Sequence, residues 1–157
     1  MKAYYNNILS IVNHKVTAVC MFIVSIMVII LFIQVIFRYI LNNSLDWPNE
    51  LSRFLLIWLT FLGMSIATWD KGHLLIDFFK RTLPNKYNNI ITLITYSLII
   101  LFLTTAFISS FKAIKFSFGI SLTSLPLSWG HAFISFPIGA GLCILYYLNF
   151  IINKRID

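Results

Sequence analysis

The sequence predicts an all-α integral membrane protein with four transmembrane helices, a short amphipathic interfacial helix, and both termini in the cytoplasm. Three observations predict this fold class: the composition, four long apolar stretches, and an uneven distribution of Lys and Arg. Of the 157 residues, 59% are hydrophobic and 11% are charged, and the mean hydropathy is +0.87. Soluble domains have about half apolar and about a quarter charged residues. The composition excludes that class and favours one membrane domain over residues 1–157.

Four stretches are long enough, or nearly so, for the roughly 20 residues that a helix needs to cross the hydrocarbon. The expected spans are 16–37, 48–68, 90–111 and 132–152. The second span begins near Pro48, which suits a first helical turn, and Glu50 suits the positive end of the helix dipole. Trp47 is then expected at the membrane interface. The first span is longer than a signal-peptide core and is expected to be retained.

The distribution of basic residues predicts the orientation. With four spans, the N-terminus, the second loop and the C-terminus share one side, which carries eight of the twelve basic residues: Lys2, Lys15, Lys71, Lys80, Arg81, Lys86, Lys154 and Arg155. The other side carries Arg38, Arg53, Lys112 and Lys115. Short cytoplasmic loops are enriched in Lys and Arg, so both termini are expected in the cytoplasm. The net charge of +7 thus reports orientation and does not indicate a nucleic-acid partner.

A short amphipathic helix is expected at about residues 75–83. In a helix, Asp77, Lys80 and Arg81 share one arc, apolar residues occupy the opposite arc, and Pro84 ends the segment. Such a helix lies on the cytoplasmic membrane surface, with its basic pair near anionic lipid headgroups. A docking surface for a partner protein is the alternative interpretation.

The polar residues argue against an active site within the spans. An ionisable residue at membrane depth costs at least about 2.5 kcal/mol and usually marks function. None of the five acidic residues lies deep in an expected span, which argues against a proton-coupled pump acting alone. The three histidines lie at or beyond helix ends, and Cys20 and Cys143 stand apart without metal-ligand spacing. We therefore expect no catalytic residue, no substrate or metal site, and no cofactor.

Charged residues gather around the first loop. Arg38 and Arg53 lie near the outer ends of the first two spans, where a hairpin would bring them close to Asp46 and Glu50. The sequence predicts a charged cluster that fixes the hairpin while the arginines reach the interface. Anion binding by the two arginines and contact with a partner protein are the alternatives.

A series of short motifs between Phe37 and Phe79 adds a family resemblance. The motifs are Phe37-Arg38-Tyr39, Leu45-Asp46-Trp47-Pro48-Asn49-Glu50-Leu51-Ser52-Arg53, Trp58 with Phe61-Leu62-Gly63, and His73-Leu74-Leu75-Ile76-Asp77-Phe78-Phe79. Further along, they are joined by Leu125-Pro126-Leu127-Ser128-Trp129 and Phe136-Pro137-Ile138-Gly139. In this order and spacing they resemble the DctQ family, the small membrane subunits of tripartite ATP-independent periplasmic (TRAP) transporters. The likeness covers roughly residues 30–150.

The resemblance implies a bacterial inner-membrane complex of three parts. These are a periplasmic solute-binding protein, a large membrane subunit that carries the substrate and sodium sites, and this small subunit as an accessory scaffold. The substrate implied is an organic acid anion, such as a C4-dicarboxylate or a sialic acid.

Eight residues are candidates for structural or subunit-interface roles. They are Arg38, Trp47, Glu50, Arg53, Trp58, Gly63, His73 and Asp77. Two other classes of function stay open on the residues alone. One is a stand-alone four-helix exporter of the small multidrug type, and the other is a membrane anchor for a redox enzyme.

Overall fold

The computed structural model describes residues 2–43, 45–70 and 85–152. The helices are α1 (Lys2–Tyr39), α2 (Trp47–Trp69), α4 (Asn85–Ser117), α5 (Trp129–Phe133) and α6 (Ser135–Ile152). Within these residues, four helical segments are long and apolar enough to cross a membrane, with α5 and α6 together forming the fourth. The predicted all-α fold with four spanning helices is confirmed. The interfacial helix expected at 75–83 lies outside the described residues.

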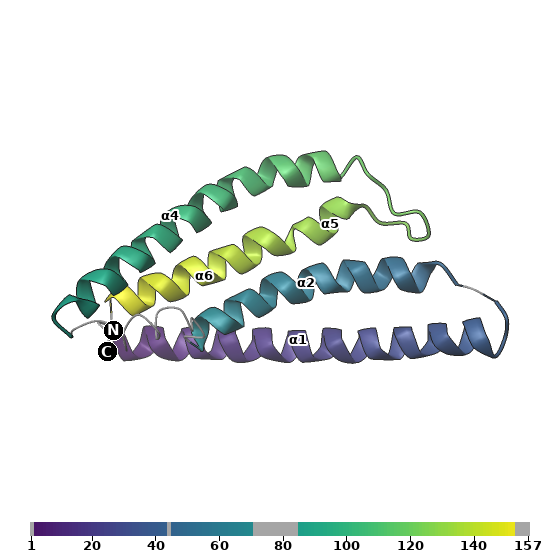
Figure 1. The fold of residues 1–157 in the computed structure, drawn as a ribbon, viewed down its shortest axis with the longest axis horizontal. Coiled ribbons are helices and arrows are strands. Elements are labelled where there is room, and N and C mark those ends of the chain that lie inside the picture. The colour runs from purple at the N-terminus through teal and green to yellow at the C-terminus, as the bar shows by residue number, and fades with distance from the viewer. Residues whose placement is uncertain (1, 44, 71–84, 153–157) are drawn as a thin grey trace.

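The helices form an open row. Helix α2 packs against α1 on one side and α6 on the other, and α4 packs against α5 and α6 (Figure 1). The order across the row is α1, α2, α6, α4, so α1 and α4 form its edges. The start of α1 and the end of α6 lie at one end of the row, which we call the terminal end. The start of α2 and the loop between α4 and α5 lie at the opposite end, the loop end.

An open row leaves many apolar side chains facing outward. Phe22 and Phe32 of α1 are 67% and 66% exposed, and Phe102 of α4 is 69% exposed. Apolar surface on this scale marks contact with a membrane or with another protein. The fold therefore fits a multi-pass membrane protein whose helix faces are covered by lipid or by a partner.

In the described part of the chain, two buried clusters hold the row together. The larger lies between α4 and α6 toward the terminal end, where the rings of Tyr96 and Tyr147 are 5.3 Å apart and Leu9 of α1 joins them. The smaller joins α1 to α2 through Cys20, Ile23 and Leu62. Aromatic pairs add about 0.5–1.5 kcal/mol each beyond the area that they bury. Such packing matters more here than in water, because lipid tails are as apolar as the side chains themselves.

Gly139 sets the spacing between α2 and α6. A Cβ atom at this position would overlap the carbonyl oxygen of Phe61 and would lie 2.8 Å from the Phe61 carbonyl carbon. Only glycine permits this approach without a backbone shift. Beside it, the rings of Phe61 and Phe136 meet edge to face at 4.9 Å. The two central helices are therefore in direct backbone contact.

The fourth span is interrupted between α5 and α6, at Ile134. Pro137 explains the break, because proline has no N–H to donate to the carbonyl of Phe133 four residues earlier. The helix itself begins at Trp129, before the expected span 132–152. The interruption places α5 at the loop end of α6.

Helices α1 and α4 are longer than the apolar stretches that predicted them. Helix α1 has 38 residues, about 57 Å at 1.5 Å per residue, against about 30 Å of hydrocarbon. The helix does not stop where the apolar run stops, because Leu9 still packs into the larger cluster and is only 5% exposed. Hydropathy locates the membrane-embedded part of a helix and not its ends.

Candidate functional site

Glu50 is the centre of a network at the loop end. It stands in the first turn of α2, and its Oε1 and Oε2 accept the backbone N–H groups of Thr123 at 2.9 Å and Ser124 at 2.7 Å. A carboxylate that accepts two N–H groups forms charge-assisted hydrogen bonds, which are stronger than neutral ones. The loop before α5 is thereby tied to the start of α2.

The loop over residues 118–128 is also fixed by its own backbone. The N–H of Leu122 donates to the carbonyl of Leu127 at 2.8 Å, and the N–H of Trp129 donates to the carbonyl of Ile120 at 3.0 Å. The Leu122 side chain is only 6% exposed. The loop is therefore an ordered hairpin that presents a defined surface.

The start of α5 is closed by a capping interaction. The Ser128 backbone N–H lies 3.4 Å from Nδ1 of His131, and the Ser128 hydroxyl lies 3.0 Å from the same nitrogen. A side chain three residues into a helix that bonds back to the cap satisfies an otherwise unpaired N–H. The rings of His131 and Phe118 are nearly perpendicular with their centroids 5.0 Å apart, and a Cβ at Gly130 would lie 2.6 Å from the Phe118 ring. The end of α4 thus packs directly onto α5.

The expected charged cluster has a different form in the structure. Among Arg38, Asp46, Glu50 and Arg53, all of which are described, no ion pair forms. Glu50 is engaged with the loop, and the Arg38 guanidinium lies 5.8 Å from the centre of the Tyr39 ring. Arg53 and Asp46 are exposed. The sequence drew attention to these residues but could not show that Glu50 binds backbone groups 73 and 74 residues away.

The remaining candidates are divided between buried and outward positions. Trp47 begins α2 and is half-buried, and Trp58 packs against the smaller cluster between α1 and α2. Gly63 points away from the other helices, because a Cβ there would meet nothing within 4 Å. His73 and Asp77 lie outside the described residues.

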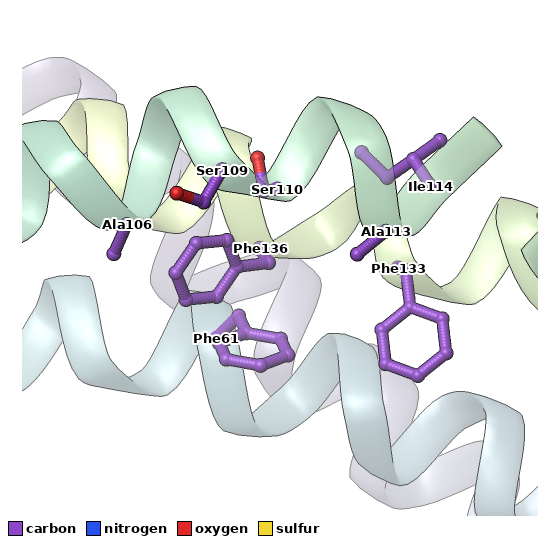
Figure 2. Close-up of a pocket in the computed structure, with 8 residues that line it drawn as sticks. All are labelled: Phe61, Ala106, Ser109, Ser110, Ala113, Ile114, Phe133 and Phe136. Carbon is purple, nitrogen blue, oxygen red and sulfur yellow. The ribbon is translucent and has the colours of Figure 1, made fainter. Parts of the chain in front are cut away.

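A pocket opens between α2, α4 and the α5–α6 segment (Figure 2). Its volume is about 350 Å³, and it is lined by Phe61, Ala106, Ser109, Ser110, Ala113, Ile114, Phe133 and Phe136. Figure 2 shows three aromatic rings facing small side chains of α4 across the opening. Sequence reasoning missed this pocket. Small residues at helical spacing along 106–113 were the available signal, but the aromatic wall comes from three other segments.

The interior contact between α2 and α6 also includes polar atoms. The Thr68 hydroxyl donates to the carbonyl of Met64 at 2.9 Å and lies 3.3 Å from the Sγ of Cys143. The Tyr146 hydroxyl is buried and has no hydrogen-bond partner within the described part of the chain. The Thr68–Cys143 contact joins the two helices, and none of these groups pairs a nucleophile with a base.

Comparison with known proteins points to a family of membrane transporters. A family model described as "Tripartite ATP-independent periplasmic transporters, DctQ component" matches residues 27–155. A protein of Haemophilus influenzae strain Rd, named as a TRAP transporter small permease protein, is 32% identical over 84 residues. That match covers 54% of this chain and 52% of the relative, so the chain spans about half the length of the relative.

Two longer relatives match as well. The sialic acid TRAP transporter permease protein SiaT of Haemophilus influenzae strain 86-028NP is 31% identical over 78 residues, which are 47% of this chain and 13% of SiaT. The isethionate TRAP transporter permease protein DctMQ of Oleidesulfovibrio alaskensis strain G20 is 27% identical over 139 residues. This second match covers 82% of the chain and 22% of DctMQ.

Proposed function

Because this chain belongs to the DctQ family of TRAP transporters, we propose that it is the small membrane subunit that braces the large membrane subunit of such a transporter. It is a transport component and not an enzyme. The observation that carries the proposal is the open row of helices, which leaves apolar side chains facing outward, among them Leu56 on the central helix α2. A chain that transports alone needs polar groups around an enclosed site, whereas a scaffold needs broad contact surfaces.

The proposed contact with the large subunit lies on the outward side of α2. Leu56, Thr60, Gly63 and Ala67 follow one another along this side at helical spacing. Leu56 is 50% exposed, and nothing in the chain would touch a Cβ at Gly63. Small residues let a neighbouring helix approach closely in a membrane. This surface, the α2 face, suits a helix of a second membrane protein.

The loop end is the proposed contact with the solute-binding protein. Glu50 holds the 118–128 hairpin in place, and Arg38 is exposed at the end of α1 that reaches the same end of the row. This assignment uses the predicted orientation, with both termini in the cytoplasm of a bacterial inner membrane and the loop end in the periplasm. An ordered, charged surface at that end favours recognition of a soluble partner.

The proposed reaction is sodium-coupled uptake of an organic acid anion. The names of two relatives include sialic acid and isethionate, and both compounds are organic acid anions. The substrate and sodium sites are proposed to lie on the large subunit. The low number of ionisable groups within the four spans supports this division of labour.

Copurification of the large subunit with the tagged chain tests the proposal. We expect Thr60→Leu and Gly63→Leu to reduce the amount of large subunit recovered, because both add bulk to the α2 face. Thr104→Leu is the matched control, since Thr104 on α4 is exposed and its hydroxyl donates to a carbonyl four residues earlier, as does that of Thr60. Equal recovery with all three variants would overturn the assignment of the α2 face. Failure of the unmodified chain to recover any large subunit would overturn the scaffold function itself.

A further inference from the structure

We propose that the pocket between α2, α4 and the α5–α6 segment binds one acyl chain of an anionic phospholipid, whose phosphate contacts Arg53. The proposal concerns the chain itself and does not depend on its partners. It combines an apolar pocket, an exposed cation near the loop end of α2, and the absence of a hydrogen bond or ion pair to that cation within the described residues.

The size and lining of the pocket favour an acyl chain. A volume of about 350 Å³ lies at the small end of ligand pockets. A helix with its side chains is about 10–12 Å across and is too wide to enter it. The rings of Phe61, Phe133 and Phe136 supply an apolar wall (Figure 2). Two serines line the pocket. The hydroxyl of Ser110 already donates to the carbonyl of Phe107 at 2.6 Å, so this hydroxyl needs no polar ligand.

The pocket lies where lipid can reach it. Its lining residues all belong to segments long and apolar enough to span a membrane. Ala113 and Phe133 line the pocket and are both exposed, so it opens to the outside of the row. Because the surrounding medium at this depth is hydrocarbon, the natural occupant is a hydrocarbon chain.

Arg53 supplies the second contact. It precedes Phe61 by eight residues, which places it about 80° from Phe61 around α2 and about 12 Å closer to the loop end. Arg53 is exposed and lies in the second turn of the span, at the depth of lipid headgroups. A guanidinium binds phosphate oxygens through paired hydrogen bonds.

The neighbouring carboxylate, that of Glu50, attracts Arg53 electrostatically but forms no ion pair with it. Glu50, one turn away, directs both oxygens to the N–H groups of Thr123 and Ser124. Within the described residues Arg53 has no hydrogen bond and no ion pair. A phosphate from the leaflet at the loop end therefore complements its charge, while the attached acyl chain reaches down α2 to Phe61. Free phosphate has no acyl chain and so would leave the apolar pocket empty.

Lipid retention by the full-length protein tests the proposal. The protein is reconstituted with equal amounts of phosphatidylglycerol and phosphatidylcholine, extracted in mild detergent, and analysed by native mass spectrometry. We expect the unmodified chain to retain one phosphatidylglycerol. Ala113→Phe, which fills the pocket, should lower retention by about tenfold, equivalent to ~1.4 kcal/mol. Arg53→Gln should abolish the preference for phosphatidylglycerol over phosphatidylcholine and leave the fold unchanged.

Two matched variants serve as controls. Ile108→Phe adds a ring to an exposed position of α4 outside the pocket. Lys115→Gln removes an exposed cation of α4 near the loop end. Both should retain phosphatidylglycerol as the unmodified chain does. Equal retention by Ala113→Phe and Ile108→Phe, or loss of selectivity in Lys115→Gln but not in Arg53→Gln, would overturn the proposal. So would a loss of large-subunit copurification in Ala113→Phe at unchanged lipid retention, because the occupant would then be a partner side chain.

Discussion

The carboxylate of Glu50 and the backbone N–H of Ser124 are 74 residues apart in the sequence and 2.7 Å apart in the structure. Together with the bond to Thr123, this contact joins the start of α2 to the hairpin that leads into α5. Helix α2 also contacts α6 through Gly139, so the two central helices are connected both in mid-span and at the loop end.

Replacing Glu50 should release the hairpin without unfolding the helices. In Glu50→Ala both acceptors are lost, and the backbone amides of Thr123 and Ser124 should exchange with deuterium faster than in the unmodified protein. Exchange within α6 should not change. Asp46→Asn is the control, since Asp46 is exposed and makes no capping bond at the start of α2. Unaltered exchange at Thr123 and Ser124 in Glu50→Ala would contradict the assigned role.

Adding one methyl group at Gly139 should destabilise the chain. In Gly139→Ala the new Cβ would overlap the Phe61 carbonyl, and overpacking of this kind costs about 1–3 kcal/mol. Gly63→Ala is the matched control, because nothing lies within 4 Å of its Cβ and alanine favours a helix by up to about 1 kcal/mol. Thermal unfolding of the purified chain in detergent measures both. A lower unfolding temperature for Gly63→Ala than for Gly139→Ala would refute the close-contact argument.

Removing the Tyr146 hydroxyl should not weaken the fold. This buried hydroxyl has no partner among the described residues, so Tyr146→Phe deletes a group that costs free energy to bury. By contrast, Thr68→Val loses the hydrogen bond to Met64 and the contact with Cys143, which should cost about 1 kcal/mol. The two variants should therefore shift the unfolding temperature differently, with Thr68→Val the lower. Strong destabilisation by Tyr146→Phe would show that its hydroxyl has a partner.

The chain alone should not carry out uptake. Liposomes that contain only this chain, given a sodium gradient, a solute-binding protein and its organic acid anion, should accumulate no solute. Adding the large subunit should restore uptake, measured with radiolabelled solute. Accumulation by the chain alone would overturn the accessory function and would favour a stand-alone transporter.

The helices were predictable from the sequence, while their arrangement was not. Long apolar stretches and the Pro48 and Glu50 pair near the start of α2 are local signals, and the motifs from Phe37 to Phe79 sufficed to predict the family. The sequence contains no comparable local signal for which helices lie next to each other. Phe22 is 67% exposed and Ile23 only 8% exposed, although both are large, apolar and adjacent in the sequence. In a membrane, side chains that face lipid and side chains that face another helix are both apolar, so hydropathy does not distinguish them.

The candidate site was predictable only in part, for a related reason. Glu50 stood out because an acid near a span is uncommon, but its partners are backbone N–H groups, which every residue except proline carries. The side chains of Thr123 and Ser124 therefore give no indication that their backbone N–H groups bind Glu50. The break at Ile134 was traceable to Pro137, whereas the pocket depends on three rings from α2, α5 and α6 that meet only after folding.

The open row divides the chain into positions that differ in their tolerance of amino-acid exchange. Phe22, Phe32 and Phe102 are largely exposed, so these positions require only an apolar side chain. Leucine, isoleucine and valine should therefore be tolerated there in related sequences. At Gly139 the neighbouring backbone admits no side chain. Relatives of this chain should therefore drift freely along the edges of the row and stay constant where α2 meets α6. An outward position that stays constant among them would then mark a contact with another protein, which offers a way to map the partner surface from sequences alone.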